Sequence, residues 1–229
     1  FYRGELAEAF AADMAAGGGL VTEEDLAAFA VVERVPLTAD YRGHQVLTNP
    51  APSFGGSLVA LTLGLLADGG TLPERGTPDH AVALTEAMVE TDRLRALGEV
   101  DARLQATRGT THVSVADREG NVASMTTSNG EASGYLVPGT GILLNNMLGE
   151  DDLHPDGFHA APAGERVASM MSPTVVLDPS GDPALVVGSG GSKRIRTTIV
   201  QVVTAVVDHG VALRPAVDGS RLHWDGDVV

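Results

Sequence analysis

The hydrophobic pattern of this chain changes once, between Gly109 and Thr110. Before that point apolar residues recur every three or four positions, as in amphipathic helices, and after it they alternate with polar residues, as in strands. No Pro- or Ser-rich linker separates the two halves. Independent domains are usually joined by such a linker. The sequence therefore predicts one α+β fold to which residues 1–109 and 110–229 both contribute.

The residues before Gly109 are expected to form mostly helices. Leu6, Phe10 and Met14 are spaced four residues apart and precede three consecutive glycines, which indicates an amphipathic helix with a glycine cap. The other elements predicted here are a short helix over 22–28 capped by Thr22, a strand–turn–strand over 35–48, a loop over 50–57, and helices over 58–67 and 79–97, the last with Asp79 at its start.

The second half is expected to form mostly strands. Val113 and Val115 alternate with His112 and Ser114, and a similar run over 122–127 follows a polar turn, which is typical of a β-hairpin. The remaining elements predicted in this half are strands over 141–146, 173–178 and 183–190 and a helix over 193–207.

Composition and charge exclude several classes of partner. Phosphate binding relies on clustered Lys and Arg, and this chain has a formal net charge of −15, so nucleic acid is not expected. No apolar run approaches the roughly 20 residues of a membrane helix, so no membrane partner is expected either. Without cysteine the chain has no disulfide, thiolate zinc site or cysteine nucleophile. Any catalysis must use Ser, Thr, His or carboxylate side chains.

The chain begins Phe1-Tyr2-Arg3, with neither an initiator Met nor a basic-then-apolar leader. We therefore expect a truncated front, with any signal peptide lying outside this sequence.

Thr110 follows a glycine at the predicted start of a strand. A threonine hydroxyl is a useful nucleophile only with a base within hydrogen-bond reach. A free α-amine supplies that base, because its pKa of roughly 8 is close to neutral pH. Attack of the hydroxyl on the Gly109 carbonyl would cut the peptide bond and create this amine, and glycine tolerates the strained backbone. A Gly-Thr-Thr run alone can equally reflect the β-propensity of threonine.

The segments around this run favour the catalytic interpretation. Eight of them, in order along the chain, match one family: FYRGELAEAF, GGLVTEEDLAAF, DYRGHQVLTNPAPSFGGS, TTHVSVADREGNVASMT, GILLNN, SMMSPTVV, GSGGSKRIRTT and AVDGSRLH. The chain resembles the γ-glutamyltranspeptidases, members of the N-terminal nucleophile (Ntn) hydrolases. The resemblance implies a four-layer αββα sandwich. It also implies that 1–109 is the C-terminal part of the large subunit and 110–229 the small, catalytic subunit, separated by self-cleavage between Gly109 and Thr110.

The resemblance assigns catalytic roles to two residues of the predicted hairpin. Thr110 matches the nucleophile, and its freed α-amine acts as the base. Ser128 lies where the family usually has a hydroxyl residue that contacts this threonine, with Ser in place of Thr. His112 is interpreted as a packing residue of the strand.

Residues 188–198, GSGGSKRIRTT, have the form of a loop that stabilises negative charge. Glycines let the backbone approach a ligand, and the helix that follows offers unpaired N–H groups. By resemblance Gly191 and Ser192 supply the oxyanion-hole amides, and a match shifted by one residue selects Gly190 and Gly191 instead. A phosphate-binding P-loop requires another spacing, with Ser or Thr where this chain has Arg194. A strand-to-helix turn without function is the plain alternative.

A γ-glutamyl group carries an α-ammonium and an α-carboxylate, so its pocket needs a carboxylate for the first and donors for the second. By resemblance Glu150 holds the ammonium, with Asp151 as the substitute if the loop shifts, although this acidic stretch could also be a solvated loop. Ser169 is one of two serines that the family presents to the α-carboxylate. Met170 replaces the other, which makes the predicted pocket less polar.

The family's carboxylate-binding arginine belongs to the front of the large subunit, which this chain does not include. Arg194 and Arg196 are candidate substitutes, and both could equally be exposed helix charges. Four residues of the acidic loop have side chains of metal-ligand type: Glu150, Asp151, His154 and His159. A loop with Pro and Gly gives them no fixed geometry. We therefore expect neither a metal nor a cofactor.

Together these features predict a γ-glutamyl transferase or hydrolase that cleaves the amide bond of glutathione and related compounds. The reaction passes through an acyl-enzyme on Thr110, with water or an amino acid as acceptor, and the two subunits pair after cleavage. One alternative is a related acylase for glutaryl or cephalosporin-type amides, which Met170 favours. Another is an inactive, truncated scaffold. Family members are often exported, so we expect a periplasmic or secreted protein.

Overall fold

A four-stranded antiparallel sheet runs through the middle of the molecule in the order β1-β2-β7-β8. The computed structural model describes residues 1–99, 109–150, 153–154, 157–158, 160 and 162–229. The strands of this sheet are β1 (Leu37–Tyr41), β2 (His44–Thr48), β7 (Thr174–Leu177) and β8 (Pro183–Val187). β2 pairs with β7 through Gln45↔Leu177, Val46↔Val176 and Leu47↔Val175. The sheet thus takes strands from both sides of Thr110.

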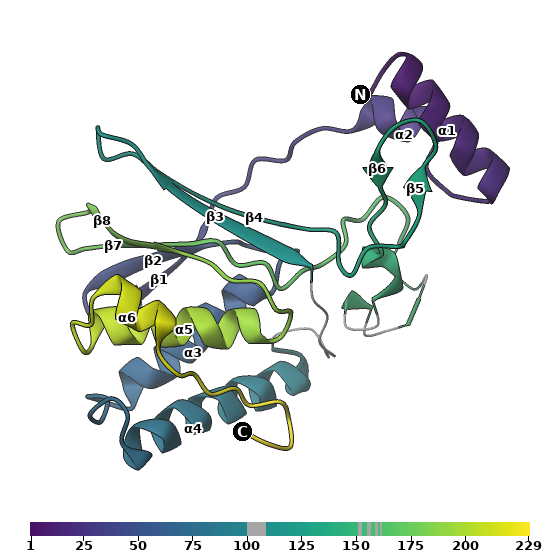
Figure 1. Cartoon of the computed structure of the whole chain (residues 1–229). Helices are drawn as coiled ribbons and strands as arrows, with labels where there is room; N and C mark the ends of the chain where they lie inside the picture. The colour runs from purple at the N-terminus through teal and green to yellow at the C-terminus, as the bar shows by residue number, and fades with distance from the viewer. Residues whose placement is uncertain (100–108, 151–152, 155–156, 159, 161) are drawn as a thin grey trace.

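A long hairpin lies over one face of this sheet. It consists of β3 (Thr110–Ala116) and β4 (Val122–Ser128), which pair in register from Thr110↔Ser128 to Ala116↔Val122 and form a two-stranded sheet of their own. Asp117 holds the turn by accepting hydrogen bonds from the backbone N–H groups of Glu119 and Asn121. Figure 1 shows the hairpin on one side of the four-stranded sheet and the longer helices on the other.

The helices on that other face are α3 (Gly55–Asp68), α4 (Pro78–Leu94), α5 (Arg194–Val207) and α6 (Leu213–Asp218). A π-helical turn, η1 (Arg95–Glu99), extends α4. Ile195, Ile199 and Val203 recur every four residues along α5 and are at most 1% exposed. They pack in one core with Leu58 of α3 and Val176 of β7. Full burial of each such aliphatic side chain contributes about 1.5–3 kcal/mol.

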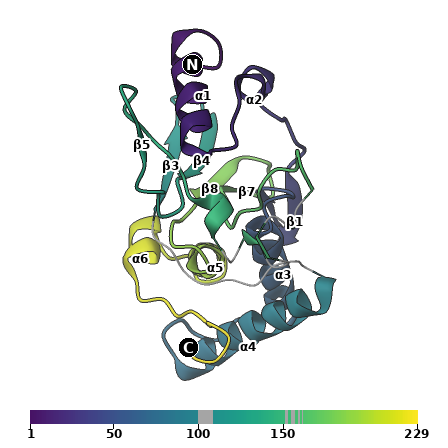
Figure 2. The same cartoon turned by 90° about the vertical axis from the view of Figure 1, so that its right-hand side faces the viewer.

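A second, smaller core lies away from the main sheet (Figure 2). It is built from α1 (Glu5–Gly17), α2 (Glu23–Ala28), β5 (Leu136–Val137) and β6 (Ile142–Leu143). The predicted glycine cap of α1 is present as Gly18 in the left-handed region, φ 74°. Thr22 caps α2 as predicted, through a reciprocal pair of hydrogen bonds with Asp25. Leu6 was expected on the buried face of α1 but is 37% exposed, since Ala7 faces the core instead.

The predicted four-layer sandwich is not confirmed by the described residues. Apart from the second core, they form three layers: the hairpin, the four-stranded sheet, and the helices (Figure 1). The outward face of the hairpin carries Val113, Val115 and Met125, which are 42%, 56% and 57% exposed. The front helices do not cover it, because α1 packs with β5 in the second core. The part of the fold that is supported is a mixed α/β arrangement of antiparallel sheets.

Several element boundaries differ from those expected. α3 starts at Gly55, inside the segment predicted as a loop, because a glycine there lets the helix approach the backbone of Met170: a Cβ would lie 2.2 Å from its carbonyl oxygen. α4 is capped by Thr77 rather than Asp79, through the N–H of His80. The strand expected over 141–146 is reduced to β6, and α6 and β5 were not predicted. None of the described helices is long and apolar enough to cross a membrane.

Candidate active site

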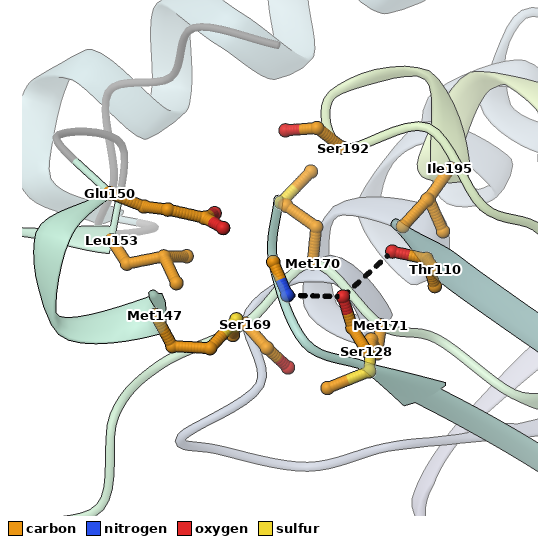
Figure 3. A pocket seen from close by; sticks show the side chains of 11 residues that line it. Thr110, Ser128, Met147, Glu150, Leu153, Ser169, Met170, Met171, Ser192 and Ile195 are labelled. Carbon is orange, nitrogen blue, oxygen red and sulfur yellow. Dashed lines mark hydrogen bonds between the residues drawn. The ribbon is translucent and has the colours of Figure 1, made fainter. Parts of the chain in front are cut away.

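Thr110 and Ser128 face each other at the open end of the hairpin. Thr110 is the first residue of β3 and Ser128 the last of β4, and they are cross-strand partners. The Thr110 Oγ1 hydroxyl donates to Ser128 Oγ at 3.1 Å. Both residues line a cavity shown in Figure 3. The two residues to which the sequence assigned hydroxyl chemistry are therefore in direct contact.

The Ser128 hydroxyl also connects both sides of the Gly109–Thr110 peptide bond. Ser128 Oγ accepts from the N–H of Gly130 at 3.0 Å and lies 3.4 Å from the carbonyl oxygen of Gly109, to which it donates. A hydroxyl has one donor and two acceptor positions, so these contacts and the one to Thr110 use its full capacity. One side chain thus touches the predicted nucleophile and the carbonyl that self-cleavage would attack.

Position 109 requires a glycine because its backbone lies very close to the backbone of Gly130. A Cβ on Gly109 would lie 1.6 Å from the carbonyl oxygen of Gly130, closer than any side chain could tolerate. The sequence explained Gly109 by backbone strain. The structure gives contact with Gly130 as the direct reason.

The loop between β8 and α5 turns through two residues with positive φ. Gly191 has φ +115° and Ser192 has φ +51°, a left-handed conformation that is unfavourable for a residue with a side chain. The turn is closed by hydrogen bonds from Arg194 N–H to Gly191 O and from Ile195 N–H to Ser192 O, both 3.0 Å. Figure 3 shows Ser192 at the edge of the cavity near Thr110.

Gly190 lies against the nucleophile strand, since a Cβ there would be 2.6 Å from the carbonyl oxygen of Thr110. The loop is thus brought to Thr110 at Gly190 and to the cavity at Ser192, with Gly191 between them. Which pair of amides, Gly190 and Gly191 or Gly191 and Ser192, would hold an oxyanion stays a prediction.

Glu150 reaches the same cavity from the other side. It follows the 3₁₀ turn η2 (Met147–Gly149) and is 9% exposed. Gly130 makes room for it: a Cβ at 130 would lie 2.0 Å from Glu150 Oε1 and 2.1 Å from Asn146 Oδ1. Figure 3 shows the carboxylate directed into the cavity. Asp151, the predicted substitute, lies outside the described residues.

Ser169 and Met170 line the cavity as well. The Ser169 hydroxyl donates to Ser53 Oγ at 3.2 Å, and the Ser53 hydroxyl contacts the carbonyl oxygens of Ser169 (3.1 Å) and Met171 (2.6 Å). Met170 is 4% exposed and also belongs to the main core. Ser53 therefore supports the loop that carries both residues. Sequence analysis placed Ser53 in a connecting loop and gave it no role.

A family model described as gamma-glutamyltranspeptidase matches residues 1–105 and 90–228, nearly the whole chain. The chain belongs to the gamma-glutamyltranspeptidase family. This membership confirms the resemblance read from the sequence and places the chain among the Ntn hydrolases.

The curated relatives of this chain include both glutathione hydrolases and acylases. The chain is 31% identical to the glutathione hydrolase proenzyme of Escherichia coli (strain K12), over 97% of this chain and 47% of that protein. It is 32% identical to the acylase ACY 1 proenzyme of Pseudomonas sp. (strain SE83), over 100% of this chain and 48% of that protein. The chain thus spans about half the length of the curated relatives it matches. Both relatives are named as proenzymes.

A solved structure supports the same fold. The cephalosporin acylase from Bacillus halodurans superposes with a TM-score of 0.77 at 28% identity, over 98% of this chain and 47% of that one. Proteins named as glutathione hydrolases and proteins named as acylases are therefore both similar to this chain.

Further residues line the cavity that sequence analysis did not single out: Gly130, Met147, Leu153, Met171 and Ile195. Four of them have apolar side chains, so this part of the cavity wall is largely aliphatic. For Ile195, its place near the start of the helix that follows the glycine loop was the sequence feature that could have indicated a position at the cavity. Met147 and Leu153 come from a segment without regular periodicity.

Arg196 does not supply a cation to the cavity. It is 2% exposed and forms an ion pair with Asp92 of α4 at 2.7 Å. Arg196 is therefore wrong as a candidate substitute for the carboxylate-binding arginine, because its guanidinium pairs with Asp92 of α4. Arg194 is exposed and is absent from the residues that line the cavity.

Only some residues of the acidic loop belong to the described part of the chain. His154 Nε2 lies 3.2 Å from the carbonyl oxygen of Met147, while Asp151 and His159 lie outside the described residues. Within the part of the chain that the structure describes, no three His, Asp or Glu side chains come together in a way that could hold a metal ion.

Proposed function

We propose that this chain forms the catalytic centre of a γ-glutamyl transferase or hydrolase that cleaves γ-glutamyl amides such as glutathione. The observation that carries the proposal is the Thr110–Ser128 contact, 3.1 Å long, beside the Gly109 carbonyl and in one cavity with Glu150. A nucleophile, a second hydroxyl and a carboxylate converge there at the start of a strand. Family membership supports the same reaction class.

Maturation is proposed to begin with attack of Thr110 Oγ1 on the carbonyl carbon of Gly109. The proton of the hydroxyl passes to the peptide nitrogen as the C–N bond breaks, and Gly109 becomes an ester on Thr110. Water then hydrolyses the ester, which releases Gly109 as a carboxylate and Thr110 with a free α-amine. Ser128 supports this step, because its hydroxyl donates to the Gly109 oxygen on which negative charge develops.

Turnover uses the freed α-amine of Thr110 as the base. It takes the proton from Oγ1 as the oxygen attacks the γ-carbonyl carbon of the substrate, and the loop at 190–192 offers backbone N–H groups to the oxyanion. The α-ammonium then gives this proton to the leaving amine, and the acyl-enzyme remains. Water or the amine of an amino acid takes up the acyl group and regenerates the Thr110 hydroxyl.

Substrate recognition is proposed to rest on Glu150 and Ser169. A buried carboxylate at the cavity wall favours an ammonium group, and an ion-assisted hydrogen bond of this kind contributes about 1.5–3 kcal/mol. The Ser169 hydroxyl lies in the same cavity and is proposed to turn from Ser53 Oγ, to which it donates in this structure, to the α-carboxylate when substrate binds. No cofactor or metal takes part in this scheme.

A related acylase is the second candidate, and a specific observation favours it. Met147, Leu153 and Met170 give the cavity an aliphatic wall, which suits an acyl chain with fewer polar groups. Named relatives at similar identity are acylases. Turnover of γ-glutamyl and glutaryl chromogenic amides with the same leaving group separates the two candidates, since glutaryl lacks the ammonium that Glu150 would bind.

Intact-mass measurement tests the proposal against an inert scaffold. We expect two polypeptides that split before Thr110, and a Thr110→Ala variant that stays whole and inactive. An active protein with an unbroken chain at this bond would overturn the mechanism. The two pieces, 1–109 and 110–229, are expected to remain together because β2 and β7 pair across the cut. Cell fractionation tests our remaining proposal, that the protein is periplasmic or secreted.

A further inference from the structure

Among the described residues, the strand that begins at Thr110 packs against the neighbouring sheet without main-chain pairing to it. β3 pairs with β4 in a separate sheet, and its inner face lies against β8 and the loop that follows. Three contacts connect them: Thr110 with Gly190, His112 with Gly188, and Ser114 with Val186. From one contact to the next, the residue number rises by two on β3 and falls by two on the β8 segment, so the two segments run in opposite directions. We call these three pairs the seam.

His112 is the middle and largest side chain of the seam. Its Nδ1 lies 2.9 Å from Thr126 Oγ1 on β4, and its Nε2 lies 2.9 Å from Ser114 Oγ. The Ser114 hydroxyl donates onward to the carbonyl oxygen of Val186 at 3.3 Å. Since that hydroxyl proton is used, Ser114 accepts from Nε2–H, and Nδ1 accepts from Thr126. These hydrogen bonds are compatible with a neutral imidazole, and burial favours that form because it lowers the pKa of His112.

The ring of His112 packs directly on the backbone at the start of the glycine loop. A Cβ on Gly188 would lie 2.2 Å from Nδ1 and 2.3 Å from Cε1. A planar ring held at both nitrogens acts as a rigid spacer between β3 and Gly188. Thr110 lies two residues before His112, and the proposed oxyanion amides begin two residues after Gly188. Together with the direct contact between Thr110 and Gly190, the ring thus fixes the separation between nucleophile and loop.

We propose that His112 is a positioning residue: it fixes the spacing of the seam and so aligns Thr110 with the backbone N–H groups of residues 190–192. This role rests on the function proposed above. His112 itself touches neither the substrate nor the reacting atoms. Misplacement of a reacting group by about 1 Å can reduce a rate about 100-fold, so a spacer next to the nucleophile has a large effect on turnover.

The first test separates alignment from substrate binding. We expect His112→Ala to lower kcat about 10- to 100-fold while KM changes less than about threefold, because Glu150 and Ser169 are not in the seam. His112→Gln, which keeps a donor toward Ser114, should recover part of kcat. His44→Ala on β2, outside the seam, is the matched control and should keep both constants. An unchanged kcat in His112→Ala, or a loss confined to KM, overturns the proposal.

A double-mutant cycle tests the contact with Gly188. The φ of Gly188 lies outside the left-handed region, and the three atoms nearest to a Cβ there all belong to the His112 ring, so the ring is the main obstacle to an alanine. We expect Gly188→Ala to lower kcat at least about fivefold in the parent but less than about twofold in the His112→Ala background, where the space is open. If Gly188→Ala lowered kcat by the same factor in both backgrounds, the His112 ring and Gly188 would act independently. That result would contradict the proposal that the ring is a spacer against Gly188.

Amide hydrogen exchange gives a readout that needs no substrate. In His112→Ala the amides of 188–192 should exchange at least about fivefold faster, while those of α3 remain unchanged. If the parent chain turns over no γ-glutamyl amide, the proposed function fails, yet faster exchange at 188–192 still supports the spacer. If the parent is active and exchange at 188–192 is the same in both proteins, the spacer is refuted and the proposed function stands.

Discussion

Gly190 lies against Thr110 so closely that a Cβ on Gly190 would be 2.6 Å from the Thr110 carbonyl oxygen and 3.2 Å from its Cβ. The two residues are 80 positions apart in the sequence. Their contact holds the proposed nucleophile and the proposed oxyanion loop in one fixed arrangement.

The first prediction follows from this contact. Gly190→Ala should slow both self-cleavage and turnover at least about tenfold, because the added methyl group must push the loop away from Thr110. Gly64→Ala is the matched control: a Cβ on Gly64 in α3 would meet nothing within 4 Å, so activity should be unchanged. Mass spectrometry of the cleaved chains and a chromogenic amide assay measure the two effects. Full activity in Gly190→Ala would mean that the loop does not depend on this contact.

The second prediction concerns the Ser128 hydroxyl. Ser128→Ala removes the contacts to Thr110 Oγ1 and Gly109 O, and we expect cleavage and kcat to fall about 10- to 100-fold, the range for lost hydrogen bonds to developing charge. Ser128→Thr keeps the hydroxyl and should retain most of both rates. The time course of cleavage after expression distinguishes these variants. Equal rates in the alanine variant and the parent would remove Ser128 from the mechanism.

The third prediction tests ammonium recognition by Glu150. Glu150→Gln should raise KM for γ-glutamyl amides about 10- to 100-fold, since a charged partner contributes about 1.5–3 kcal/mol. KM for a glutaryl amide should stay the same or fall, because the glutaryl group has no ammonium and its own carboxylate is repelled by Glu150. Glu119→Gln at the exposed hairpin turn serves as the control. Parallel changes for both substrates would argue against ammonium binding.

The fourth prediction concerns stability, through the ion pair between Asp92 of α4 and Arg196 of α5. Arg196 is 2% exposed, and within the described part of the chain its Nε and Nη1 have no hydrogen-bond partner. Asp92→Asn leaves this buried cation uncompensated, so we expect the free energy of unfolding to fall by about 3–5 kcal/mol. Asp218→Asn breaks the exposed pair with Arg214, 92% and 65% exposed, and should change stability by less than about 1 kcal/mol. Urea titration with a common m-value measures both. Equal losses in the two variants would contradict the distinction.

The fifth prediction is a loss of stability in mild acid. Burial is the main cause that lowers the pKa of His80, His112 and His223 below the usual 6.5. The unfolded chain then binds protons more readily than the folded one, so stability present above pH 6.5 is lost as the pH falls from there toward the lowered pKa values. Urea unfolding at about pH 7.5 and about pH 5.5 should reveal the loss, and His223→Asn should reduce it. A flat profile over this range would contradict the prediction.

Local features of the fold could be predicted because the interactions that form them lie close together in the chain. The capping box joins Thr22 and Asp25, three residues apart, and Gly18 supplies the left-handed cap of α1. The hairpin needs only an alternating pattern and a turn, and the register that pairs Thr110 with Ser128 follows from both. The family was visible in the order of short motifs.

Contacts between distant segments could not be predicted in the same way. Ser53 supports Ser169 across 116 positions, and Gly130 makes room for the carboxylate of Glu150. Each depends on how separate elements are placed relative to one another, and no local pattern encodes a distance of that kind. The same holds for Arg196, whose sequence position gives no sign of its partner on α4.

The sequence by itself determined most of the elements, the family and the residues that could carry the chemistry, because backbone propensity and hydrophobic period act within a few residues. Only the tertiary structure decided the layers and the geometry of the site. The front helices pack on β5 rather than over the hairpin, and Gly188 and Gly190 meet β3 where a side chain would not fit. Close packing between segments that are distant in the sequence fixes how these elements lie, because side chains in a protein interior fill the space between them.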